Sequence, residues 1–375
     1  MRERIHSIDT LRALAIFFIT IAHVQPFRGF GTHGNLVFFV LDTIGQFDVP
    51  FFFVTSGFFL GAKLHTTSVN SIVRGTGRKL GSIFVFGKLV SVTAAVAVAA
   101  IVGSSVMSEL SDALFNFSPA SLLYYGDAQA VPLWFLSALF FSIVLVSGFV
   151  KFNKIRYLLP VAALFHVVGI LSMNYPMVLD VPFRIRDALF FGFFYVALGY
   201  TIRTTEWTPK ENHSHLYLGA VGFFLGAQLI EQYAIGYIIG ENVLTQTVYL
   251  TEYTISTVLL VLAIFAYALS NPQLGKNTIL PTVGRHALGI YLLHLPVFHL
   301  LHATKQFWIP VIGFPLPSTL LWQLTITPLV YVLALGTYLA MARLGVIDPE
   351  GGHIPWLSRL RSRGGLSVRS RLSNE

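Results

Sequence analysis

The amino-acid sequence predicts an all-α polytopic integral membrane protein, and composition, apolar run length and charge distribution each indicate this class. Of its 375 residues, 54% are hydrophobic and only 11% are charged, and the mean hydropathy is +0.69. Soluble domains carry about 25% charged residues. Because only helices and closed barrels satisfy their backbone hydrogen bonds inside a bilayer, apolar runs of helical length predict membrane-spanning helices.

Ten apolar runs are each close to the length that a helix needs to cross about 30 Å of hydrocarbon. They cover residues 9–27, 36–62, 82–103, 131–150, 157–173, 187–203, 216–236, 247–270, 282–303 and 318–343. We therefore expect about ten transmembrane helices in a membrane domain over residues 1–345. Residues 346–375 are rich in Arg, Ser and Gly and lack apolar periodicity, which predicts a basic, disordered tail.

The Lys and Arg residues between the runs predict the orientation of the chain. An even number of crossings places both termini on one side. With the termini inside, inner segments hold nineteen Lys and Arg residues, whereas outer segments hold only Arg28, Arg184, Arg186 and Lys305. The positive-inside rule then makes both termini cytoplasmic. The same rule accounts for the net charge of +8, and no basic stripe with interleaved aromatic residues predicts a nucleic-acid partner.

The chain contains no cysteine, which excludes disulfides, thiolate metal sites and a cysteine nucleophile. Four histidines, His286, His294, His299 and His302, crowd the ninth run. They form no HExxH motif and have no clear carboxylate partner, so we predict no metal site. His294, which precedes Pro296, is the best candidate of the four for lining a cavity.

The first apolar run carries two polar side chains, Arg12 and His23, that are costly inside a membrane. His23 follows Arg12 by eleven positions, so the two side chains share one helix face and stand about 16 Å apart along the axis. An imidazole suits general-base chemistry, and a guanidinium suits a phosphate or carboxylate. The alternatives are a histidine that bonds to a neighbouring helix, and an arginine that extends to the inner edge and pairs with Asp9.

The second apolar run is acidic and contains Pro50. Asp42 and Asp48 lie inside it, although a charged residue at a helix centre costs about 2.5–3.5 kcal/mol on insertion scales. Pro50 removes a backbone donor and predicts a kink. We expect this helix to form the second wall of one polar cavity, opposite the helix of Arg12 and His23.

Two further features have both a functional and a simpler interpretation. The inner loop 63–82 contains Arg74, Arg78 and Lys79, which suit a phosphorylated ligand but also follow from positive-inside bias alone. Trp134 begins the fourth run, where it is a candidate for the cavity or for the aromatic belt at the membrane interface.

These residues belong to motifs that resemble the membrane acyltransferase 3 family. The resemblance extends from Arg4 to about Arg343 and includes the pair Arg12-x10-His23. Three longer stretches match as well: VPFFFVTSGF at 49–58, LWFL at 133–136 and GRHALGIYLLH at 284–294. The family commonly has Arg-x-x-Arg in the inner loop, where this chain has Arg74-x3-Arg78-Lys79. The chain resembles the stand-alone form, without an extracytoplasmic C-terminal domain.

The resemblance implies O-acyl transfer, usually of an acetyl group, from cytoplasmic acyl-CoA to a hydroxyl of a cell-envelope glycan or a similar acceptor. It implies a multi-pass protein of the plasma (inner) membrane in which acyl-CoA, expected to be acetyl-CoA, is a donor substrate and no cofactor is permanently bound. By this analogy His23 is the general base and Arg12 its essential companion, and we expect Asp48 to orient His23. Arg74, Arg78 and Lys79 would recognise the CoA phosphates, and the expected substrate cavity includes Ser56, Trp134 and His294.

A proton-coupled transporter or a glycan flippase would also use buried Arg, Asp and His residues. Carriers often contain internal repeats with paired broken helices. The two halves of this chain contain no convincing repeat, which favours the acyltransferase.

Overall fold

The computed structural model describes residues 4–115, 118–125, 133–175, 178–182, 185–248, 251 and 254–347. Helices joined by turns and irregular segments form this part, which contains no β-strand. Eight of its helical segments are long and apolar enough to cross a membrane, and two shorter apolar helices cover Ala188–Thr204 and Ile255–Ser270. The predicted class is therefore confirmed, because the chain is an all-α, multi-pass membrane protein. The predicted tail lies outside the described residues from position 348 onward.

Each of the ten predicted runs overlaps one of these helical segments. The principal helices are α1 His6–Val24, α2 Gly31–Gly45, α3 Asp48–Leu64, α4 Val69–Val102, α5 Val106–Phe115, α6 Trp134–Lys151, α7 Leu158–Asn174, α8 Phe193–Thr204, α9 Ser214–Tyr233, α10 Ile255–Ser270, α11 Leu280–Arg285, α12 Ala287–Ile312 and α13 Leu320–Arg343.

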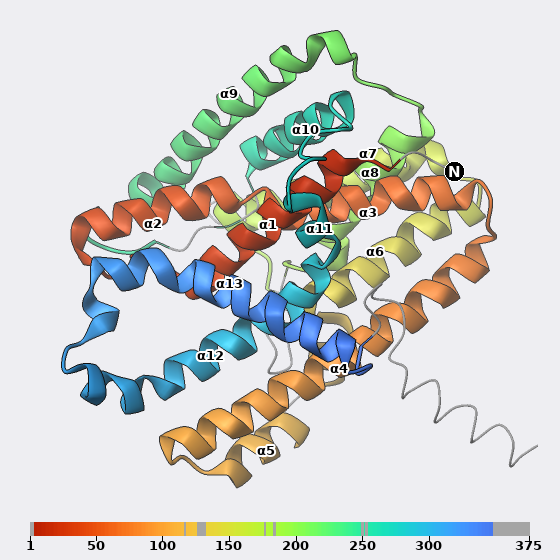
Figure 1. Ribbon diagram of the computed structural model, residues 1–375. Coiled ribbons are helices and arrows are strands. Elements are labelled where there is room, and N and C mark those ends of the chain that lie inside the picture. Colours follow the sequence, from red (N-terminus) through yellow and green to blue (C-terminus); the bar gives the residue numbers. More distant parts are fainter. Residues whose placement is uncertain are drawn as a thin grey trace, which may run out of the picture.

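Helix α1 lies in the middle of the bundle, with α9 and α10 on one side and α12 and α13 on the other (Figure 1). It contacts α2, α3, α10, α11, α12 and α13. The helix ends at Val24, and its cap residue Gln25 has a left-handed backbone (φ 54°) and donates its N–H to the Ile21 carbonyl. A residue of α13 holds the turn that follows α1, because the Phe27 N–H donates to the Gln323 side chain over 2.7 Å. The His23 end of α1 is therefore held in place by a distant helix.

The second predicted run forms two helices, so the expectation of one helix kinked at Pro50 is wrong. Helix α2 ends at Gly45, a turn follows at Gln46 and Phe47, and α3 begins at Asp48. Pro50 lies in the first turn of α3, where a backbone N–H has no partner within the helix and proline is tolerated. The chain therefore breaks before the proline.

Two large hydrophobic clusters form most of the core in the described part of the chain. The first is built mainly from α3, α6, α7, α8 and α10, and the second from α1, α4, α6, α12 and α13. Val49, Phe52 and Phe135 pack against both clusters. The junction between the two clusters is therefore a place where side chains of many helices meet.

Polar side chains inside α9 bond to backbone groups at the ends of its neighbours. Gln228 donates to the Thr43 carbonyl over 2.8 Å, and Gln232 donates to the Thr251 carbonyl over 2.7 Å. Glu231 accepts from the N–H groups of Ile255 and Ser256 at the start of α10, at 3.0 and 2.9 Å. These polar residues satisfy backbone groups that hydrocarbon cannot satisfy.

Candidate active site

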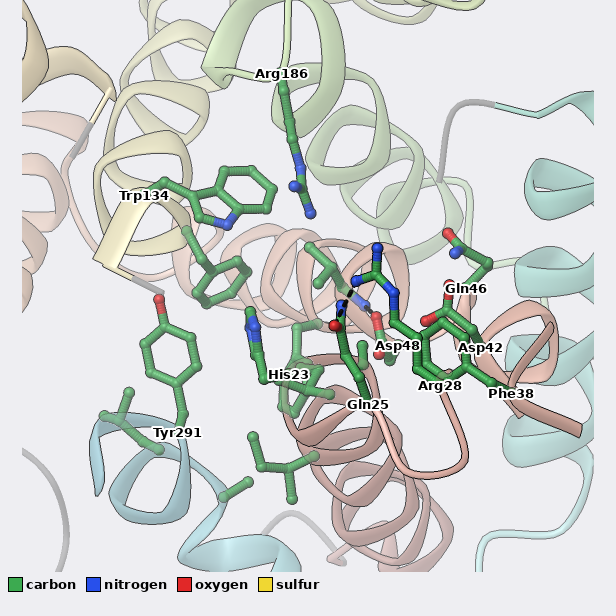
Figure 2. Close-up of a pocket in the computed structure, with 18 of the residues that line it drawn as sticks. His23, Gln25, Arg28, Phe38, Asp42, Gln46, Asp48, Trp134, Arg186 and Tyr291 are labelled. Atoms are coloured by element: carbon green, nitrogen blue, oxygen red, sulfur yellow. Dashed lines mark hydrogen bonds between the residues drawn. The ribbon is translucent and has the colours of Figure 1, made fainter. Parts of the chain in front are cut away.

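A cavity of about 280 Å³ lies at the junction of the two core clusters. Helices α1, α2, α3, α6 and α12 contribute to its wall, and Arg186 enters it from the segment before the π-helical turn η4 (Ala188–Gly192). Its polar and aromatic lining is drawn in Figure 2 and includes His23, Gln25, Arg28, Phe38, Asp42, Gln46, Asp48, Trp134, Arg186 and Tyr291. The fold thus brings ionisable side chains from separate helices into one cavity.

His23 lies in the last turn of α1 and lines the cavity. Its ring centre is 5.1 Å from that of His294 on α12, and the two ring planes are inclined by 37°. His294 is fully buried, with its Nδ1 atom 3.1 Å from the Ile290 carbonyl oxygen. Because a carbonyl oxygen can only accept, the His294 Nδ1–H is the donor, and Nε2 of the neutral ring is an acceptor. His294 therefore packs against His23 from outside the cavity lining.

Acidic and amide side chains form one wall of the cavity. Asp42 and Gln46 come from the end of α2, and Asp48 comes from the first turn of α3. The Asp48 carboxylate accepts a hydrogen bond from the Val49 N–H, and an acidic side chain is favoured at this end of a helix. The break between α2 and α3 therefore lets residues of both helices line the same cavity. The role of Asp48 in orienting His23 stays a prediction.

Aromatic side chains form the opposite wall. Trp134 and Phe135 come from the start of α6, and the ring centre of Phe135 is 5.8 Å from that of Tyr291 on α12. The guanidinium carbon of Arg186 lies 4.7 Å from the centre of the Trp134 ring, within the range of a cation–π contact. The cavity thus combines one polar wall with one aromatic wall.

The segment that carries Arg186 is anchored by the next residue. Asp187 is buried, and its carboxylate accepts from the Phe190 N–H over 2.9 Å and from the Tyr124 hydroxyl over 3.0 Å. Burial and the neighbouring Asp187 carboxylate raise the pKa of Tyr124 above its ordinary value, so the hydroxyl keeps its proton and remains a donor. These bonds fix the backbone at the point where Arg186 enters the cavity.

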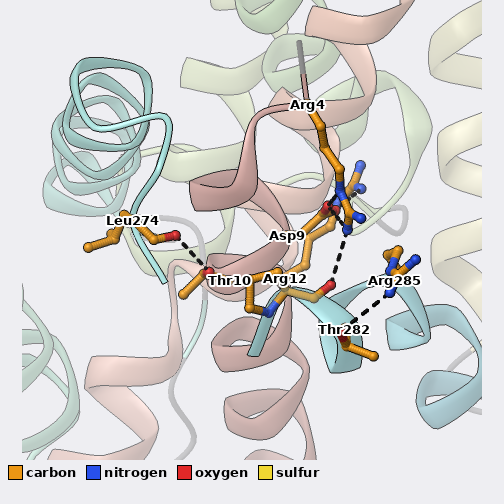
Figure 3. A network of polar contacts seen from close by, with 8 residues as sticks. Arg4, Asp9, Thr10, Arg12, Leu274, Thr282 and Arg285 are labelled. Atoms are coloured by element: carbon orange, nitrogen blue, oxygen red, sulfur yellow. Dashed lines mark hydrogen bonds and ion pairs between the residues drawn. The ribbon is translucent and has the colours of Figure 1, made fainter. Parts of the chain in front are cut away.

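Arg12 lies outside the cavity lining, in a polar network at the start of α1 (Figure 3). Asp9 accepts from Arg4 at 2.5 and 2.8 Å and from Arg12 at 3.2 Å. The pairing with Asp9, which is the alternative interpretation of Arg12, is therefore present. Two guanidinium groups share this one carboxylate, so the group of three keeps a net positive charge. The guanidinium of Arg12 also lies 5.5 Å from the centre of the Phe59 ring on α3.

The remaining predicted site residues lie apart from His23. Ser56 lies outside the cavity lining and donates to the Phe52 carbonyl of its own helix over 2.8 Å. Arg74, Arg78 and Lys79 are exposed near the start of α4. Among the described residues, no group of three or more His, Asp and Glu side chains is placed to hold a metal ion. Of the predicted residues, the cavity therefore unites His23, Asp48 and Trp134, with His294 adjacent.

Sequence reasoning missed Arg186 and Tyr291 as cavity residues. One signal was available for Arg186, because outer segments are expected to hold very few Lys and Arg residues and each of these needs an explanation. Two of the four, Arg28 and Arg186, line the cavity. Tyr291 lies within an apolar motif, where a tyrosine gives no comparable signal.

The helical fold and the ionisable cavity together define a multi-pass membrane protein with a candidate active site among its spanning helices. The chain matches the family model described as an acyltransferase domain over residues 5–341, and it belongs to the acyltransferase 3 family. The protein is therefore a membrane acyltransferase, which acts on an acyl donor and an acceptor.

A more distant similarity connects the chain with a longer protein. An amino-acid racemase from Enterococcus faecalis is 24% identical over 233 residues, which are 57% of this chain and 30% of the racemase. The chain thus spans less than a third of that relative's length. No solved structure has a significant match to this chain.

Proposed function

We propose that this protein transfers an acyl group, in particular acetyl, from cytoplasmic acyl-CoA to a hydroxyl of a cell-envelope glycan. The proposal places it in the plasma membrane with both termini in the cytoplasm. One observation carries the proposal. The face of α1 on which His23 lines the cavity also carries Arg12. Arg12 lies near the end of α1 that the distribution of Lys and Arg residues assigns to the cytoplasm.

A donor route along two helix faces supports this assignment. On α1, Ile16 and Ile19 line the cavity together with His23 and share a face with Arg12 by helical spacing. On α3, Val49 and Phe52 line the cavity. These two faces meet again where Arg12 lies over the Phe59 ring. Phosphates held near Arg12 would leave the extended pantetheine arm to follow these faces toward His23.

The net positive charge around Asp9 supports a phosphate site at Arg12. Since Arg4 and Arg12 share the Asp9 carboxylate, one positive charge is left for an anionic ligand. A guanidinium binds phosphate through paired N–H groups. In the proposal, Arg74, Arg78 and Lys79 add attraction for CoA at the same membrane face.

The chemistry at His23 follows from the cavity. The acceptor hydroxyl attacks the thioester carbonyl carbon while His23 takes its proton, and the carbon–sulfur bond then breaks. The CoA thiolate leaves and accepts from His23 the proton that came from the acceptor hydroxyl, so His23 returns to its starting state. Asp48, in the same cavity, is the group that we assign to orienting His23.

The two walls of the cavity support a glycan as acceptor. A sugar ring has an apolar face of C–H groups and an edge of hydroxyls. The aromatic wall with Trp134 and Phe135 suits the apolar face, and the wall with Asp42, Gln46 and Asp48 suits the hydroxyls. We therefore favour a carbohydrate hydroxyl over a purely apolar alcohol.

The decisive experiment compares His23→Ala with His33→Ala in cells that lack the native gene. His33 is an exposed histidine on α2, so its replacement is a matched control. Mass spectrometry of envelope glycans should detect acyl groups with the wild-type and His33→Ala proteins and none with His23→Ala. Full acylation by a folded His23→Ala variant would disprove the proposal.

A second assay separates this function from transport. Purified protein is given acetyl-CoA and envelope glycans prepared from the deletion strain, and thiol release is followed with a thiol reagent. Because the chain contains no cysteine, released CoA is the only thiol that forms. A transporter would leave acetyl-CoA intact.

A further inference from the structure

Arg186 is a permanent cation inside the cavity of His23 that the proposed function has not used. We propose that its guanidinium binds the carbonyl oxygen of the acyl donor and stabilises the negative charge that develops there during transfer. This inference rests on the proposed function and adds a catalytic residue to it.

The position of Arg186 supports this role. It lines the same cavity as His23 and enters it from the segment before η4, across from α1. Figure 2 shows its side chain extending between Trp134 and the wall of Asp48 toward the interior of the cavity. A carbonyl group held near His23 would thus lie between a proton acceptor on one side and a fixed positive charge on the other.

The guanidinium is held in position before any substrate arrives. The Trp134 ring lies 4.7 Å from the guanidinium carbon, and Asp187 fixes the adjoining backbone through Phe190 and Tyr124. Transition-state stabilisation depends on such preorganised groups, which do not reorient as charge develops. Arg186 meets this condition, because Asp187 holds the adjoining backbone and Trp134 holds the guanidinium.

The other charged groups of the cavity are less suited to this role. Asp42 and Asp48 accept hydrogen bonds when ionised and cannot donate to an oxyanion. Arg28 is exposed, and it donates to Gln25 beyond the end of α1. An arginine keeps its charge and its N–H donors at any relevant pH. Arg186 therefore combines a permanent charge and a side chain that extends into the cavity with a guanidinium that packs on the Trp134 ring.

Acyl transfer with Arg186 in this role requires no reactant besides the acyl donor and the acceptor. The acceptor oxygen bonds to the thioester carbon, His23 takes the hydroxyl proton, and the carbonyl π electrons move onto the oxygen beside Arg186. The tetrahedral intermediate then restores the carbonyl group and expels the CoA thiolate, which takes the proton from His23. The products are the acyl ester and free CoA thiol.

The test compares Arg186→Met and Arg186→Lys with the control Arg156→Met. Arg156 also lies against an aromatic ring, 4.5 Å from the centre of Tyr157, but it is exposed and outside the cavity. We expect kcat to fall about 100-fold in Arg186→Met, as for the loss of one oxyanion donor elsewhere. Arg186→Lys should retain part of the rate because it keeps the charge, and Arg156→Met should match the wild type.

Binding of S-ethyl-CoA, a thioether that lacks the carbonyl oxygen, separates catalysis from folding and from donor binding. Its affinity should be unchanged in both Arg186 variants, which also reports that they are folded. The inference is overturned if kcat stays within about threefold of the wild type, or if S-ethyl-CoA binding falls as much as kcat. If Arg186→Met does not fold, a folded Arg186→Lys variant with the wild-type rate and the wild-type KM for acetyl-CoA overturns it as well. Failure of the wild-type protein to release CoA thiol would instead refute the proposed function.

Discussion

Gly57 of α3 and Gly199 of α8 face each other's backbone across the contact between the two helices. A Cβ atom at Gly57 would lie 2.0 Å from the Val196 carbonyl oxygen, and one at Gly199 would lie 1.9 Å from the Val54 carbonyl oxygen. Small residues at such positions let membrane helices approach closely. Gly57, which belongs to the VPFFFVTSGF motif at 49–58, therefore allows α3 and α8 to pack closely.

Gly57→Ala should destabilise the protein because its methyl group has no space. Overpacking of a tight core costs about 1–3 kcal/mol, occasionally more, so the melting temperature of the purified protein should fall clearly. Gly222→Ala on α9 is the control, because a Cβ there meets no atom within 4 Å and alanine favours helix. Equal melting temperatures for the two variants would contradict this account of α3 and α8.

His294→Phe should lower kcat while the protein stays folded. Phenylalanine keeps a ring in the buried space but removes the polar group beside His23. We expect kcat to fall about tenfold, a part of the 10²–10⁴ that general-base catalysis contributes, with the KM for acetyl-CoA unchanged. His302→Gln, at an exposed position of the same helix, is the control. An unchanged kcat in His294→Phe would limit His294 to packing.

Replacing Arg74, Arg78 and Lys79 together by alanine should raise the KM for acetyl-CoA and leave kcat unchanged. Each exposed charge pair contributes about 0.2–1 kcal/mol, so three lost contacts predict roughly a tenfold effect that shrinks at high salt. The matched control is the Lys154→Ala and Lys210→Ala double variant, which removes exposed charge on the same predicted side. If both variants keep the wild-type KM, Arg74, Arg78 and Lys79 serve only to orient the chain in the membrane.

Single cysteines should report the orientation of the chain, since the protein contains none. Ser108 and Thr205 are both exposed and are predicted on the outer and inner side, respectively. In sealed right-side-out vesicles, an impermeant maleimide should label Ser108→Cys at once and Thr205→Cys only after detergent is added. The reverse pattern would place Arg12 outside and remove the cytoplasmic donor route.

Glu231→Ala should weaken the attachment of α10 to α9. The carboxylate accepts two N–H groups at the start of α10, and loss of a helix cap costs about 0.5–2 kcal/mol. The melting temperature should fall, while the activity measured well below it stays near the wild-type value because Glu231 lies outside the cavity lining. Glu241→Ala, at an exposed position, should be neutral in both assays.

Much of the fold could be predicted from the sequence because hydropathy and helix length decide it. All ten predicted runs have a helical counterpart, and the presence of His23 and Asp48 in one polar cavity followed from the cost of ionisable groups in hydrocarbon. The break before Asp48 was missed, because Pro50 is the visible helix breaker whereas the turn occupies Gln46 and Phe47. A proline is tolerated in the first turn of a helix, so its position marks a helix start as readily as a kink.

The remaining parts of the site depend on distances between elements that are far apart in the sequence. Nothing local to Arg186 indicates that it meets Trp134, since 52 positions separate them and the contact arises from the packing of α6 against η4. Likewise, Ser56 is a polar residue in an apolar run and was expected to line the cavity, yet its hydroxyl donates to a carbonyl of its own helix. Such outcomes depend on tertiary packing, which the spacing of residues along one helix does not encode.

The polar edge of α9 determines how this helix is rotated about its long axis. In a bilayer, an apolar face gains little by turning inward, because lipid tails are as apolar as leucine. Gln228, Glu231 and Gln232 have fixed backbone partners on other segments, and only one rotation of α9 satisfies all three. The polar residues that interrupt the apolar sequence of α9 are thus the ones that give this helix a defined azimuth in the bundle.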